Sequence, residues 1–153
     1  MKNVLIIDDD ELILSVLAQG LKSCTKEWNV LTAENGREAL KILDSVSVDL
    51  IVTDLNMPEM DGYELLTYTR RNRPDIQVVV MTADYSPEVE KRLLPLGVSR
   101  CFEKPFSFKE LAEWILGKET GNEEENDVPN RFFYRRHHCQ PRSSCRVHLG
   151  RMA

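Results

Sequence analysis

Five side chains that could together carry out phosphoryl chemistry stand at the ends of short apolar runs. Asp8 and Asp9 follow residues 4–7, Asp54 follows 50–53, Thr82 follows 78–81, and Lys104 follows 101–103. Carboxylates can hold a divalent cation, and one of them can attack phosphorus as a nucleophile. A lysine and a threonine hydroxyl can bind the phosphoryl oxygens. These residue types predict a phosphoryl-transfer site, provided that the fold brings them together.

The segments that must position these residues alternate between strand and helix patterns through residues 1–118. Apolar, β-rich runs predict buried parallel strands at 4–7, 28–32, 50–53, 76–81 and 99–102. Helical spacing, turn residues and caps predict helices near 12–21, 37–44, 63–71, 87–97 and 108–116. Five βα units this short can bury both sheet faces only as a doubly wound α/β sandwich with a five-stranded parallel sheet.

Three local features of the helices give sharper expectations. In the first helix, the predicted apolar face consists of Leu12, Ile13, Val16, Leu17 and Leu21. Pro95 falls in the last turn of the fourth helix, where the missing N–H should shorten or bend that helix. Ser107 is the predicted N-cap of the fifth helix, with Glu110 three residues later.

The sheet topology predicts where the chemistry takes place. Ligands of open α/β sheets bind outside the carboxyl ends of the strands, so the five side chains should meet there. Carboxylates about 4 Å apart repel by up to about 4 kcal/mol per pair at an effective dielectric constant of 20 unless a cation lies among them. Alternatively, Asp8, Asp9 and Asp10 only cap and charge a helix N-terminus. We favour the cap for Asp10, and the site for the other two because Asp54 follows a separate strand.

Composition limits the remaining possibilities for this chain of 153 residues. The net charge of −5 argues against nucleic-acid binding by the folded part. No secretory signal and no run of about 20 apolar residues is visible, so no membrane span is expected. Cys24, Cys101, Cys139 and Cys145 form no CxxC pair, and we expect a reducing, cytoplasmic location.

Residues 119–153 differ in amino-acid composition from the rest of the chain. Acidic residues come first and arginines follow, without a sustained period of 2 or 3.6. We predict a disordered tail without an output domain. Its histidines and cysteines lack the spacing of a metal site, and zinc binding is kept only as an alternative. Two further alternatives are that residues 132–136 contact a nucleic acid or a membrane, and that the segment results from a shifted reading frame.

Four motifs carry a resemblance to a known family. Residues 7–10 (IDDD), 53–62 (TDLNMPEMDG), 81–83 (MTA) and 103–106 (EKPF) occur in the order and spacing of receiver domains. Residues 2–117 therefore resemble the receiver domain of two-component response regulators, of the stand-alone chemotaxis-regulator kind. The resemblance implies a flavodoxin-like (βα)5 fold. It also implies that Asp54 accepts a phosphoryl group from a sensor histidine kinase or a phosphotransfer protein.

The resemblance also implies roles for the other motif residues. Mg²⁺ (or Mn²⁺) would be held by Asp9, Asp54 and the backbone carbonyl of Asn56, with Asp8 helping through water. Thr82 would be the switch residue and Lys104 would bind the phosphoryl group. Lys104 would be followed by a cis peptide bond to Pro105.

Two positions of the family tune the lifetime of the phosphoryl group, and they are Asn56 and Asp84 here. An amide and a carboxylate can both orient an attacking water, so we expect a comparatively labile group. The alternative is that both are simply polar loop residues.

Two features depart from the family pattern, Cys101 and the Pro95 of the fourth helix. Relatives usually place an aromatic residue three positions before the lysine, where Cys101 stands here. Phe102 points the opposite way on a strand and should pack in the core. We therefore do not expect the usual coupling of threonine and aromatic ring. Because Pro95 alters the fourth helix, we expect an unusual response of the surface formed by the fourth helix, fifth strand and fifth helix. This surface is the expected site for an unidentified downstream protein or for homodimerisation.

Other function classes fit the sequence less well. A phosphatase of the haloacid dehalogenase type would need a second aspartate where Asn56 stands. A flavin carrier would need a phosphate-binding loop after the first strand, and Asp8, Asp9 and Asp10 at this place oppose phosphate binding. An adaptor whose switch has decayed through Cys101 and Pro95 is the serious alternative. We expect a phosphoacceptor with only self-phosphorylation and autodephosphorylation chemistry, not an enzyme that turns over a separate substrate.

Overall fold

The computed structural model describes residues 1–117 of the chain. Its strands are β1 (Lys2–Ile7), β2 (Trp28–Ala33), β3 (Leu50–Asp54), β4 (Gln77–Thr82) and β5 (Arg100–Glu103). Its helices are α1 (Glu11–Cys24), α2 (Gly36–Ser45), α3 (Gly62–Asn72), α4 (Pro87–Leu93), the 3-10 helix η1 (Leu94–Leu96) and α5 (Phe108–Ile115). The predicted boundary at residue 118 and the predicted tail, 119–153, lie outside the described residues.

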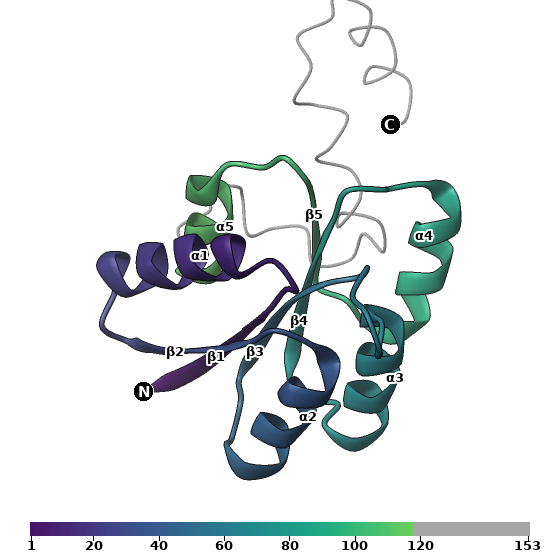
Figure 1. Ribbon diagram of the computed structural model, residues 1–153, viewed down its shortest axis with the longest axis horizontal. Coiled ribbons are helices and arrows are strands. Elements are labelled where there is room, and N and C mark those ends of the chain that lie inside the picture. Colours follow the sequence, from purple (N-terminus) through teal and green to yellow (C-terminus); the bar gives the residue numbers. More distant parts are fainter. Residues whose placement is uncertain (118–153) are drawn as a thin grey trace, which may run out of the picture. The chain divides into compact units, whose positions relative to one another are not determined.

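The five strands form one parallel sheet in the order β2-β1-β3-β4-β5. The order reverses between β1 and β3, which pair with Val4 opposite Leu50 and Ile7 opposite Thr53. Helices α1 and α5 cover one face of the sheet and α2, α3 and α4 cover the other (Figure 1). The predicted doubly wound α/β fold is confirmed, and the switch point falls where Asp8 and Asp54 end their strands.

The core alternates along each strand because successive strand residues face opposite sides of the sheet. Val4, Ile6, Val52, Val79 and Phe102 belong to the cluster that packs under α1 and α5. The residues between them are also buried, and they face the other helical layer. Burial on both sides accounts for the nearly unbroken apolar runs, and it holds the carboxyl ends of the strands in place.

The predicted apolar face of α1 is partly wrong. Leu17 and Leu21 are buried, but Leu12 is 71% exposed and Val16 is 54% exposed. Leu14 and Ala18 are buried in their place. The helix carries apolar residues on more than half of its circumference, so spacing alone could not determine which stripe meets the sheet and α5.

The expected effect of Pro95 on the fourth helix is confirmed. Regular α-helix ends at Leu93, and Pro95 lies inside the 3-10 turn η1. The turn then closes on Gly97, whose φ of 67° lies in the left-handed region that favours glycine. The short α4 is therefore joined to β5 through η1 and residues 97–99.

The helices are short throughout the described part of the chain. The longest, α1, has 14 residues, whereas a membrane span needs about 20. Among residues 1–117, no helix combines the length and the apolar character that crossing a membrane requires.

Candidate functional site

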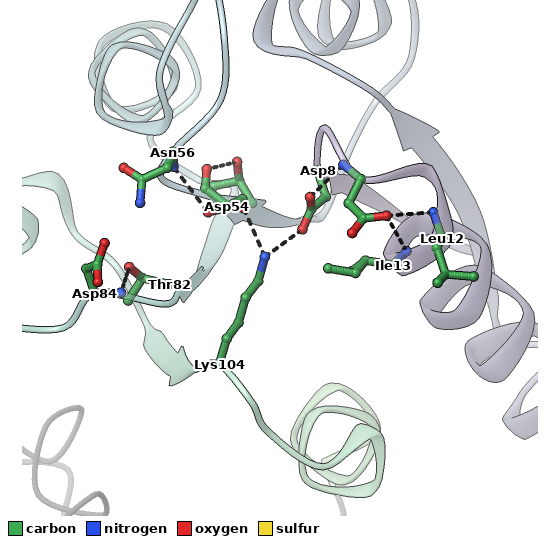
Figure 2. Close-up of polar contacts among 10 residues, drawn as sticks. Asp8, Leu12, Ile13, Asp54, Asn56, Thr82, Asp84 and Lys104 are labelled. Atoms are coloured by element: carbon green, nitrogen blue, oxygen red, sulfur yellow. Dashed lines mark hydrogen bonds and ion pairs between the residues drawn. The ribbon is translucent and has the colours of Figure 1, made fainter.

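The carboxyl ends of β1, β3 and β5 bring the predicted residues to one end of the sheet. Asp8 follows β1, Asp54 is the last residue of β3, and Lys104 follows β5. Figure 2 shows the Lys104 side chain reaching between the carboxylates of Asp8 and Asp54. These two acids are 46 residues apart in sequence, yet β1 and β3 are hydrogen-bonded neighbours. The site is therefore a product of the sheet order.

Lys104 forms two short ion pairs. Its Nζ lies 2.9 Å from Asp8 Oδ2 and 2.9 Å from Asp54 Oδ2. The Asp8 side chain is 1% exposed and that of Asp54 is 10% exposed. Burial alone would lower the pKa of Lys104, but the hydrogen bonds to Asp54 and Asp8 outweigh it and raise the pKa above its ordinary value. Lys104 therefore stays charged at neutral pH and acts as a fixed cation between the two acids.

Lys104 supplies one positive charge to a cluster of three carboxylates, so it does not neutralise the cluster. Oxygens of Asp8, Asp9 and Asp54 lie within 4.8 Å of one another. Asp9 is exposed, whereas the other two are buried. Hard carboxylate oxygens with one side open to solvent suit a small divalent cation that keeps some of its waters. The arrangement therefore fits a metal ion.

We predict that Asp9→Asn stabilises the metal-free protein. The substitution removes one charge from a crowded group of acids, and because Asp9 is exposed to water each repulsion it makes costs only roughly 1 kcal/mol. The free energy of unfolding in urea with EDTA should rise by about 1 kcal/mol. Any stabilisation of the wild type by Mg²⁺ should shrink, because one of the three clustered carboxylates has been removed.

Asp75→Asn is the matched control for this prediction. Asp75 is an exposed acid that precedes β4, at the opposite end of the sheet. The control changes net charge by the same amount but should leave both the EDTA stability and the Mg²⁺ effect unchanged. Equal stability of wild type and Asp9→Asn in EDTA would contradict the repulsion on which the prediction rests.

Asp10 has the capping role favoured for it. Its side chain accepts hydrogen bonds from the backbone N–H groups of Leu12 (2.9 Å) and Ile13 (3.4 Å) at the start of α1. Its own backbone N–H donates to Asp8 Oδ1 at 2.9 Å. The cap therefore also helps to orient the Asp8 carboxylate, which sequence reasoning did not anticipate.

The start of the loop after β3 is hydrogen-bonded to the Asp54 carboxylate. The backbone N–H of Asn56 donates to Asp54 Oδ1 at 3.1 Å. At the far end, Gly62 starts α3 so close to β3 that a Cβ on it would lie 2.5 Å from the Asp54 carbonyl oxygen. Only glycine permits this approach, which holds the loop tightly around Asp54.

Thr82 and Lys104 are linked through the backbone of neighbouring strands. The Lys104 N–H donates to the Thr82 carbonyl at 2.7 Å. The buried Thr82 hydroxyl accepts the N–H of Asp84 at 3.2 Å. The Lys104–Pro105 peptide bond is cis. Movement of Thr82 would consequently act on both the base of Lys104 and the loop that carries Asp84.

Cys101 is buried in β5, and Phe102 is buried in the core beneath α1 and α5, as predicted. Sequence reasoning missed a cation–π contact between α3 and α4. The Arg92 guanidinium of α4 lies 3.5 Å from the ring centroid of Tyr63 in α3. Burial raises the pKa of Tyr63 above its ordinary value. The positive charge of Arg92 lowers this pKa, whereas Asp61 and Cys101 raise it further.

Comparison with known proteins gives consistent matches over the described residues. The family described as "Response regulator receiver domain" matches residues 4–116. Among solved structures, a CheY-like receiver domain protein from Methanospirillum hungatei is 30% identical, with a TM-score of 0.72, over 77% of this chain and 93% of that one. The response regulator TrrA from Thermotoga maritima, solved with Mg²⁺ and BeF, is 31% identical, with a TM-score of 0.67, over 76% of this chain and 98% of that one.

Curated relatives match over the same region. The alkaline phosphatase synthesis transcriptional regulatory protein PhoP of Bacillus subtilis is 35% identical over 72% of this chain and 45% of its own length. The transcriptional regulatory protein GlrR of Escherichia coli is 35% identical over 69% of this chain and 22% of its own. The sensor histidine kinase RcsC of Salmonella typhi is 33% identical over 73% of this chain and 12% of its own. The aligned part therefore covers less than half of each of these relatives.

Proposed function

The chain belongs to the family of response regulator receiver domains, which act in phosphorylation-dependent signalling, and from this we propose that Asp54 is its phosphoacceptor. The supporting observation is the position of Asp54 at the end of β3, where its carboxylate pairs with the Lys104 Nζ and lies within 4.8 Å of the Asp8 and Asp9 carboxylates. Because the Lys104 Nζ lies 2.9 Å from the Asp54 carboxylate, its positive charge is already in place to pair with the three oxygens of an incoming phosphoryl group.

The donor is a phosphohistidine of a sensor kinase or of a phosphotransfer protein. An oxygen of Asp54 forms a bond to phosphorus as the bond from phosphorus to the imidazole nitrogen breaks, and the imidazole leaves. Lys104 then pairs with a phosphoryl oxygen, and the Thr82 hydroxyl donates to another. The chain turns over no separate substrate in this scheme; only formation and hydrolysis of its own acyl phosphate occur.

The acid cluster would hold Mg²⁺, or Mn²⁺ in its place, because the carboxylates of Asp8, Asp9 and Asp54 lie close enough to share one ion. Asp9, Asp54 and the Asn56 backbone carbonyl would be the ligands, and Asp8 would contribute through a water. The ion would supply positive charge that neutralises the phosphoryl oxygens in a pocket which would otherwise repel them. Removal of the metal with EDTA should therefore stop phosphorylation without unfolding the protein.

The test is incubation with acetyl phosphate and Mg²⁺, followed by intact-mass measurement and reduction with borohydride. A single phosphoryl addition that EDTA prevents, located at Asp54 by the reduced residue in a peptide digest, supports the proposal. No addition, together with no binding of beryllofluoride, would overturn it and favour a constitutive adaptor. Steady hydrolysis of p-nitrophenyl phosphate would instead favour a phosphatase.

We predict a labile phosphoryl group whose lifetime depends on Asn56 and Asp84. Both side chains are exposed, and their backbone N–H groups bond to Asp54 Oδ1 and Thr82 Oγ1. They can therefore orient water near the acyl phosphate. Asn56→Met or Asp84→Ala should slow the loss of phosphoryl mass about tenfold, a barrier change of about 1.4 kcal/mol. Glu88→Ala, an exposed change in α4, should not alter the decay; equal decay in all variants would contradict this role.

The output surface consists of α4, β5 and α5. It adjoins Thr82 and Lys104, whose backbones are bonded across β4 and β5. Phosphorylation draws Thr82 toward the phosphoryl group on Asp54, while Lys104, already paired with Asp54, shifts to a phosphoryl oxygen. These movements change the population of surface conformations. An unidentified downstream protein, or a second copy of the chain, binds the changed surface. Sedimentation with and without beryllofluoride distinguishes these two partners, since only the second raises the mass of the isolated protein.

A further inference from the structure

The loop between β3 and α3 is held at both ends by close backbone contacts. At its start, the Asn56 N–H is bonded to Asp54 Oδ1. At its end, the Gly62 N–H donates to the Leu55 carbonyl at 2.9 Å. These bonds close the loop but leave its middle, Pro58–Met60, to be positioned by something else.

The middle of the loop rests on a glycine of another helix. Gly36 is the first residue of α2, and a Cβ on it would lie 2.8 Å from Met60 Cγ, 2.9 Å from Met60 Cβ and 2.9 Å from Met60 Sδ. Real Cβ atoms do not make contacts this short. Because Met60 Cβ is bonded directly to the loop backbone, rotation of the methionine side chain cannot relieve all of these contacts. A side chain at position 36 would have to push the loop itself.

Other contacts of the loop are weaker constraints. The Arg37 guanidinium lies 3.7 Å from the Glu59 carboxylate, but both side chains are largely exposed, so the pair contributes little. Glu59 has a φ of 69°, a left-handed conformation that a glutamate adopts only when its surroundings require it. The Met60 N–H donates to the Pro58 carbonyl at 2.9 Å, which closes the turn around Glu59. This turn directs Met60 onto Gly36.

We propose that Gly36 is a positioning residue for the metal site. Its contact with Met60 determines how far the loop lies from the end of β3. This distance in turn determines the position of the Asn56 carbonyl relative to the metal ion. The inference rests on the proposed function, in which this carbonyl is a metal ligand. Helix formation gives no reason for a glycine here, because Asn35 already caps α2 through the Glu38 N–H and alanine is the better helix former.

The experiment compares the Mg²⁺ affinity of the wild type and Gly36→Ala by calorimetric titration, at a temperature where circular dichroism shows both to be folded. The Kd of Gly36→Ala should rise about tenfold, as for other groups that position metal ligands. Gly20→Ala is the matched control. A Cβ on Gly20 in α1 would lie 2.5 Å from the Phe108 ring of α5, a similar clash away from the loop. This control should lower thermal stability and leave the Kd unchanged.

Met60→Ala provides a second variant that adds no atoms. It removes Cγ and Sδ from the contact with Gly36, and should raise the Kd severalfold even if Gly36→Ala does not fold. Wild-type affinity in Met60→Ala, or in folded Gly36→Ala, would overturn the positioning role alone. Absence of Mg²⁺ binding by the wild type would overturn the proposed metal site as well, so the two failures are distinguishable.

Discussion

Asp54→Asn should abolish the uptake of a phosphoryl group from acetyl phosphate. A neutral amide is a poor nucleophile, and its oxygen cannot form a stable acyl phosphate. We expect the modified fraction, measured by intact mass at a fixed time, to fall by at least about a hundredfold, as when a nucleophile is removed from other covalent mechanisms. The protein should stay folded, because Lys104 keeps its 2.9 Å ion pair with Asp8.

Asp10→Asn is the matched control, since it makes the same chemical change close to the site. Asparagine caps a helix as well as aspartate does, so α1 and the contact with Asp8 should be preserved. This variant should be phosphorylated like the wild type. A phosphoryl group still present on Asp54→Asn, with the same EDTA sensitivity, would show that another residue is the acceptor.

Lys104→Met should have the largest effect on stability. It leaves two buried carboxylates, Asp8 and Asp54, without the cation that separates them. Breaking a fully buried ion pair costs several kcal/mol, and because the Lys104 side chain is 20% exposed we expect a smaller loss of about 2 kcal/mol. The loss should be measured by urea unfolding in EDTA. Mg²⁺ should recover part of it by supplying positive charge to the same oxygens.

Lys109→Met is the control for removing a lysine. Lys109 is 81% exposed and pairs with Glu113 at 3.8 Å, so its loss should be nearly neutral. The pKa of Lys104 is raised in the folded state, so its stabilisation is complete below the ordinary lysine range and is lost only as pH rises through the higher folded pKa. The difference between wild type and Lys104→Met should therefore stay constant from neutral pH up to that range. A difference that vanished near pH 8 would contradict the two ion pairs.

Most of the fold could be predicted because its signals are local. The apolar runs that end at Asp8, Asp54 and Thr82 are buried strands, and each carries its polar residue at the end that a parallel sheet gathers to one edge. The regular helix ends before Pro95 because the proline ring leaves this residue without a backbone N–H to donate. Helix caps at Asp10 and Ser107 depend on residues two or three positions away.

The burial of α1 could not be predicted in the same way. Apolar residues occupy much of the helix surface, and only contact with the sheet and α5 selects Leu14 and Ala18 over Leu12 and Val16. The hydrophobic effect is non-directional, so an apolar residue reveals that it can be buried but not which neighbour will bury it.

The sequence by itself therefore determined the sheet, its carboxyl edge and the set of groups that meet there. Only the tertiary structure decided how those groups pair: Lys104 with both Asp8 and Asp54, Asp10 with Asp8, Gly36 with Met60, and Arg92 with Tyr63. Strand and helix patterns repeat over a few residues and can be read along the chain. Most of these contacts join residues dozens of positions apart, and their geometry depends on how whole elements pack against one another.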